Sequence, residues 1–120
     1  MSEINVIFPT SGDPIVCQPG EFAPRGERVI WCIHSSNPLI KSVEIEFTDP
    51  SAEFFDRTPD PKKLRKEVID GQVDFYGHVP NYLVPLPSPK IAKYTVRGYD
   101  TVSGSNVVAE VDPVIVTTGP

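Results

Sequence analysis

Hydrophobic and polar residues alternate most regularly over residues 41–48, where two glutamates separate Val43, Ile45 and Phe47. Alternation with a period of two places one set of side chains in a core and the other in water, which is typical of a half-buried β-strand. Asp49-Pro50 follows and ends the pattern. This segment therefore predicts a β-strand with one face in the core and the other face in water.

Most other apolar segments are equally short, and prolines and glycines separate them. Residues 29–33 are apolar on both faces around Trp31, which predicts a central strand whose tryptophan anchors the core. The 14 prolines lie between the apolar segments, as expected for strands joined by stiff loops. Strands are predicted at residues 4–8, 14–18, 27–34, 41–48, 90–99, 106–111 and 114–117.

The middle of the chain, residues 60–71, allows two interpretations. A short helix would begin at Asp60-Pro61 and end at Gly71, but lysines in its first turn oppose the helix dipole. The alternative is a hairpin that turns at Asp70-Gly71, a common tight-turn dipeptide. With either interpretation of residues 60–71, the chain has seven or eight short strands. This number predicts an all-β fold, namely a two-sheet Greek-key β-sandwich with at most one short helix. The length suits one domain, residues 1–120.

The charge of the chain narrows the classes of partner. Acidic residues outnumber basic ones by 16 to 11, which argues against binding to nucleic acid or to an anionic membrane. No apolar segment approaches the roughly 20 residues needed to cross a bilayer. No signal peptide is visible, which favours a cytoplasmic location unless an export signal was removed. The partner expected is another protein.

Four side chains could form a metal site, namely Cys17, Cys32, His34 and His78. Cys32 and His34 would lie on one face of a strand, but a site needs at least three ligands. We favour the interpretation that Cys32 is a buried thiol beside a histidine at the strand end, so no metal or other cofactor is expected. Without an export signal, two reduced cysteines are expected rather than a disulfide.

Catalytic motifs are absent from the sequence. It has no Gly-x-Ser-x-Gly elbow and no glycine-rich phosphate loop ending in Lys-Ser or Lys-Thr. The basic run at residues 62–66 is interpreted as a solvated face, and the acidic residues between 49 and 60 as a charged surface loop. We therefore do not expect an enzyme.

Several segments resemble a cupredoxin-like domain: Pro19-Gly20, Val29-Ile30-Trp31, residues 43–47, Tyr94-Thr95-Val96 and residues 112–116. The resemblance implies a strand with a buried aromatic residue, a turn, a second amphipathic strand, a late tyrosine-bearing strand and a closing strand. Immunoglobulin-like sandwiches share much of this pattern. The family takes copper ligands from just before the second amphipathic strand and from a late Cys-His-Met loop. Residues 40–42 and 90–120 contain no histidine, cysteine or methionine, so the resemblance implies the fold without the copper site.

Five large apolar residues lie in proline-rich segments outside the predicted strands. They either cap an open end of the sandwich, which we favour, or form an exposed patch that binds a partner. The function expected is a non-catalytic protein-interaction or structural module, and the alternative is a metal-binding protein. The candidate partner-binding residues are Phe54, Phe55, Tyr82, Leu83 and Leu86.

Overall fold

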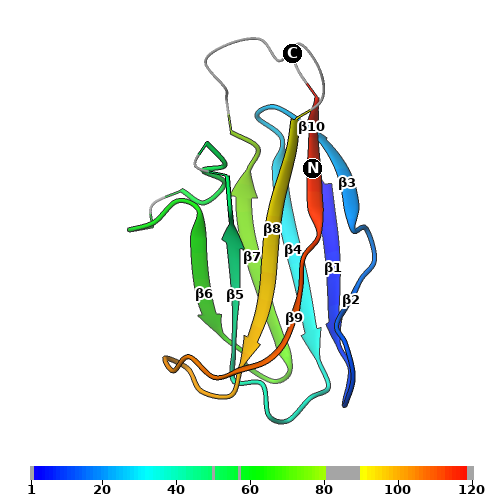
Figure 1. The fold of residues 1–120 in the computed structure, drawn as a ribbon, viewed down its shortest axis with the longest axis vertical. Coiled ribbons are helices and arrows are strands. Elements are labelled where there is room, and N and C mark those ends of the chain that lie inside the picture. Colours follow the sequence, from blue (N-terminus) through cyan, green and yellow to red (C-terminus); the bar gives the residue numbers. More distant parts are fainter. Residues whose placement is uncertain (1, 50, 57, 81–89, 119–120) are drawn as a thin grey trace.

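The computed structural model describes residues 2–49, 51–56, 58–80 and 90–118, which form two β-sheets packed face to face and no helix (Figure 1). The predicted all-β sandwich is confirmed, although the described residues form ten strands rather than seven or eight. The strands are β1 Ser2–Phe8, β2 Ile15–Val16, β3 Gly20–Pro24, β4 Arg28–Ser35, β5 Ser42–Phe47, β6 Lys63–Glu67, β7 Gln72–His78, β8 Lys90–Tyr99, β9 Val107–Val111 and β10 Val114–Thr118.

Each sheet mixes parallel and antiparallel pairs. Sheet A has the order β2-β1-β4-β7, with β1 parallel to β4. Sheet B has the order β3-β10-β8-β5-β6, with β3 parallel to β10, and β9 also pairs with β8. The chain crosses repeatedly between the sheets, so long-range pairing defines both. No helix in the described part of the chain is long and apolar enough to cross a membrane.

Trp31 on β4 lies at the centre of the core and is fully buried, which confirms the prediction for this residue. Its ring packs edge-on against Phe47, Phe54 and Tyr94, with ring centroids 6.1, 6.3 and 5.9 Å away. Phe55 lies closer, at 5.6 Å. Edge-to-face aromatic pairs of this kind add to the stabilisation that burial provides.

Residues 60–71 form no helix, and the hairpin interpretation holds only at its turn. Ile69 and Gln72 exchange two backbone hydrogen bonds of 3.1 Å around Asp70-Gly71. The two arms then separate, because β6 pairs with β5 in sheet B while β7 pairs with β4 in sheet A. A locally encoded turn therefore becomes a crossover between the two sheets.

One end of the sandwich carries four connecting segments, and we call it the loop end. The segments are residues 9–14, 36–41, 68–71 and 100–106, and they lie together at the bottom of Figure 1. They come from both sheets, so they close the lower opening between them.

Candidate functional site

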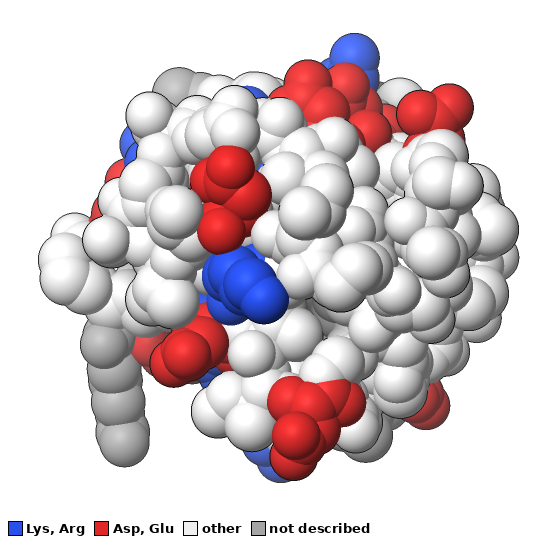
Figure 2. All heavy atoms as spheres, turned by 90° about the horizontal axis from the view of Figure 1, so that it is seen from below, with Lys and Arg blue, Asp and Glu red and all other residues white. Residues whose placement is uncertain are grey.

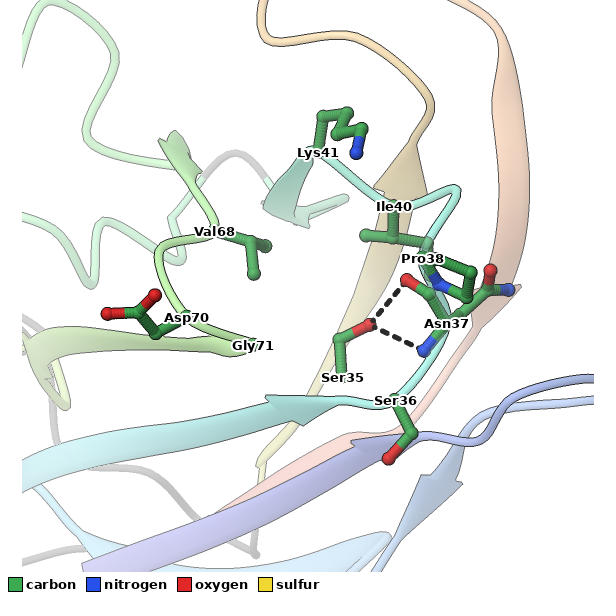
Figure 3. A pocket seen from close by; sticks show the side chains of 9 residues that line it. All are labelled: Ser35, Ser36, Asn37, Pro38, Ile40, Lys41, Val68, Asp70 and Gly71. Carbon is green, nitrogen blue, oxygen red and sulfur yellow. Dashed lines mark hydrogen bonds between the residues drawn. The ribbon is translucent and has the colours of Figure 1, made fainter.

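A cavity of about 300 Å³ opens at the loop end, between residues 35–41 and residues 68–71 (Figure 3). One wall follows β4 and the other follows β6, so the cavity lies where the chain crosses between the sheets. The lining mixes hydroxyl, amide, charged and aliphatic groups. It consists of Ser35, Ser36, Asn37, Pro38, Ile40, Lys41, Val68, Asp70 and Gly71.

The first wall is a turn held by its own polar side chains. The Ser35 hydroxyl lies 3.3 Å from both the backbone nitrogen and the carbonyl oxygen of Asn37. The Asn37 side-chain oxygen accepts a 3.0 Å hydrogen bond from the Leu39 backbone nitrogen, as in an Asx-turn. This network satisfies the turn internally and leaves the side chain of Leu39 in solvent.

The second wall depends on backbone conformation. Asp70 and Gly71 have φ values of 53° and 72°, as in a type I′ hairpin turn. A Cβ atom on Gly71 would lie 2.8 Å from the Ser35 carbonyl oxygen, so glycine allows the close approach of the two walls. The Ser35 backbone nitrogen donates a 2.8 Å hydrogen bond to the Gly71 carbonyl, which joins the walls directly.

The charged groups of the cavity lie at its margin. Lys41 lies at the rim, and the Asp70 carboxylate is turned away from the hollow in Figure 3. Val68 and Ile40 extend into the space between the two walls. The cavity therefore combines a mostly polar lining with the aliphatic side chains of Ile40 and Val68, which suits an inserted side chain of mixed character.

Three segments of the loop end each carry an exposed large apolar side chain, and none of the three side chains lines the cavity. Leu39, Ile69 and Val102 are 62%, 65% and 50% exposed. Figure 2 looks onto this end and shows a mostly uncharged face, with a basic patch near its middle and acidic patches around it. Exposed apolar residues that gather on one face of a domain indicate an interaction surface.

A second polar cluster covers the lower half of the outer face of sheet B. Glu44 is buried there and accepts hydrogen bonds from Arg97 at 3.3 Å and from the Tyr99 hydroxyl at 3.0 Å. Lys63 lies 3.8 Å from the same carboxylate. Arg97 also donates a 2.7 Å hydrogen bond to Glu46, and this hydrogen bond raises the pKa of Arg97 above its ordinary value.

Arg65 extends this cluster toward the edge of the sheet. Its guanidinium lies 3.8 Å from the centre of the Tyr99 ring and donates to the Ser42 hydroxyl and the Thr101 carbonyl, each at 3.1 Å. Burial and the hydrogen bond to Glu44 raise the pKa of Tyr99. Because these groups are bound to one another, we interpret the cluster as structural.

The four candidate metal ligands are spread over sheet A and its edge. Cys32 and His34 share the outer face of β4, but His34 pairs with Gln72 and His78 pairs with Arg28 at the opposite end of β7. Cys17 is exposed after β2. In the described ranges, no group of three or more histidine, cysteine or acidic side chains could hold a metal ion.

The two cysteines are both free, and Cys32 is less exposed than Cys17. The Cys32 thiol lies 3.3 Å from a Glu3 carboxylate oxygen, and its partial burial and this neighbour raise its pKa to about 11. The thiolate form needed for nucleophilic or metal chemistry is therefore disfavoured. His78 lies 3.0 Å from Asp56 at the surface.

Two of the candidate partner-binding residues belong to the core. Phe54 and Phe55 are buried, and Phe54 stacks on Phe47 with centroids 4.1 Å apart. The interpretation in which these rings form an exposed patch is therefore wrong for both, because the segment after β5 folds inward and covers Trp31. Tyr82, Leu83 and Leu86 lie outside the described residues.

Sequence analysis did not identify Leu39, Ile69 and Val102. Each lies beside a turn signal, namely Asn37-Pro38, Asp70-Gly71 and Ser103-Gly104. A large apolar residue next to a turn was the available signal, but it does not show that the three turns meet at one end.

Comparison with known proteins identified no relative of this chain. No protein-family model matches the chain, and no curated protein matches it in sequence.

Proposed function

We propose that this chain is a non-catalytic protein-interaction module that binds its partner with the loop end. The observation that carries the proposal is the exposure of Leu39, Ile69 and Val102 at the loop end, where the cavity opens. A partner that inserts one side chain between the two walls would lie next to Leu39 and Ile69, which adjoin lining residues in the chain. Buried apolar contacts in a central pocket are the usual source of binding energy in such interfaces.

We further propose that the module has a metal-free cupredoxin-like fold. The support is the sequence of elements: β4 with its buried tryptophan, the turn at residues 36–41, the amphipathic β5, and the tyrosine-bearing β8 that leads to the closing β10. By this resemblance the copper ligands would come from residues 40–42, at the loop end, and from a late loop within residues 90–120. Neither contains cysteine, histidine or methionine.

The proposal is tested by capture with the immobilised protein. The double variant Leu39→Ser, Ile69→Ser should lose a partner that the wild type retains. The matched control, Ile7→Ser with Tyr76→Ser, removes two exposed apolar residues from the outer face of sheet A and should retain it. Surface substitutions of this kind usually change stability by less than about 0.5 kcal/mol, so both variants should melt near the wild-type temperature. Equal capture by both double variants would contradict the proposal.

A further inference from the structure

The strand β3 forms one edge of sheet B and lies at the margin of the molecule in Figure 1. Among the described residues, β10 is its one partner in the sheet. The Val114 backbone nitrogen donates a 2.8 Å hydrogen bond to the Pro19 carbonyl. In a parallel ladder the backbone groups of alternate residues point to opposite sides, so residues 19, 21 and 23 face β10. The backbone groups of Gly20 and Phe22 therefore face outward, whereas Pro24 has no nitrogen donor and its carbonyl accepts a 3.1 Å hydrogen bond from the Glu27 nitrogen.

An apolar row crosses the outer face of sheet B and ends at this edge. The register places Phe22 beside Val116 and Val116 beside Ile91. Phe22 is 66% exposed, and Ile91 is also exposed. An edge strand with open backbone groups and an exposed aromatic residue is a template for pairing with another strand.

We propose that β3 pairs antiparallel with β3 of a second copy of this chain, around a twofold axis at Phe22. The two Phe22 residues would exchange both backbone hydrogen bonds. Gly20 would lie opposite Pro24 of the second copy, but Pro24 has no nitrogen donor and its carbonyl already accepts from the Glu27 nitrogen, so the Phe22 pair supplies the backbone hydrogen bonds of the contact. Sheet B would then continue through the dimer, and the apolar row would double in length.

The pattern of β3 is self-complementary, which favours a second copy over an unrelated strand. Glu21 would face Ala23 of the second copy, so no like charges lie directly opposite. A filament would instead need β3 to pair with a different edge strand, such as β6 on the far side of sheet B. There Lys63 and Arg65 are bound to Glu44 and Ser42, and Lys66 reaches toward sheet A. Charged edges of this kind resist pairing, so the association should stop at a dimer.

The first test is sedimentation velocity over a range of protein concentrations up to about 1 mM, because a contact this small should be weak. The wild type should approach a dimer, and Phe22→Ser should raise the dissociation constant at least about tenfold. Leu39→Ser is the matched control, since Leu39 is 62% exposed at the loop end. A wild type that stays monomeric, or a dimer that is insensitive to Phe22→Ser, would overturn the proposal.

The second test fixes the register by disulfide trapping in a Cys17→Ser background. Residues opposite each other in a hydrogen-bonded antiparallel pair have Cα atoms about 5.5 Å apart, within disulfide range. Phe22→Cys should therefore form a covalent dimer on oxidation. Glu21→Cys should not, because its own copy lies on a diagonal, about 7–8 Å away. Equal trapping at both positions, or none at Phe22→Cys, would overturn the twofold register. The proposal does not depend on the proposed function, because β3 lies away from the loop end.

Discussion

The outer face of sheet B has two halves of opposite character, although the single strand β8 runs through both. Where β8 pairs with β5 and β9, its outward side chains Thr95, Arg97 and Tyr99 enter a closed polar network. Where β8 pairs with β10, Ile91 joins the apolar row that ends at Phe22, and the exposed Lys93 is the charged residue of β8 beside it. We call these regions the charged half and the apolar half.

The two halves also end at edges of opposite character. The charged half ends at β6, whose Lys63, Arg65 and Lys66 all bind other groups of the domain. The apolar half ends at β3, where Phe22 is exposed. The difference shows that one sheet can protect one edge against pairing while it leaves the other available.

Most of the stability of the domain should come from the aromatic core beneath the two halves, and not from either half. Trp31→Ala should lower the free energy of unfolding by about 3–5 kcal/mol, the usual loss for a large buried aromatic residue. Tyr76→Ala is the control, because this aromatic side chain is exposed, and its effect should be below about 1 kcal/mol. Denaturant unfolding measures both. A small loss for Trp31→Ala would mean that the surface network carries the fold.

Arg97 and Ile91 lie on the same strand, β8, one in each half, so substitutions at these two positions compare how much each half contributes to stability. Arg97→Met removes the cation that binds Glu44, Glu46 and Glu110 and leaves Glu44 buried with a more distant lysine. We expect a loss of about 1–3 kcal/mol, reduced from the value for fully buried pairs because Arg97 is partly exposed. Ile91→Thr in the apolar half should change stability by about 0.5 kcal/mol or less. Equal losses in denaturant unfolding would remove the distinction between the halves.

The charged half should also weaken at alkaline pH. The pKa of Tyr99 is raised in the folded state by burial and by its hydrogen bond to Glu44. A raised pKa favours the folded state below the unfolded pKa of about 10, and this contribution is lost as the pH rises further. Tyr99→Phe should therefore reduce the fall in melting temperature above pH 10. An unchanged fall in this variant would show that Tyr99 is not responsible.

The smallest expected effect on stability concerns the protected edge. The Lys66 ammonium donates a 2.7 Å hydrogen bond to the Asp74 carbonyl and lies 5.5 Å from the centre of the Phe75 ring. Lys66→Val should change stability by less than about 1 kcal/mol but should increase concentration-dependent aggregation, measured by light scattering. Lys41→Val, which lies outside the edge strands β3 and β6, is the control. If the two variants aggregate equally, the charges of β6 do not protect the edge.

The sequence by itself determined the fold class and the element at the centre of the core. The alternation at residues 41–48 corresponds to β5, and the two-faced apolar segment around Trp31 corresponds to β4. These assignments succeed because a period of two and burial on both faces are local properties of a strand. The Asp70-Gly71 turn is local in the same way, since its glycine and aspartate accept positive φ values.

Only the tertiary structure decided what lies on each surface. The alternation places Glu44 in water, but Arg97 and Tyr99 from a strand about 50 residues away cover it. The basic run interpreted as a solvated face is an edge strand, and Phe54 and Phe55 are core residues. Burial, edge position and the meeting of three turns at one end depend on contacts between distant segments, which no local pattern encodes.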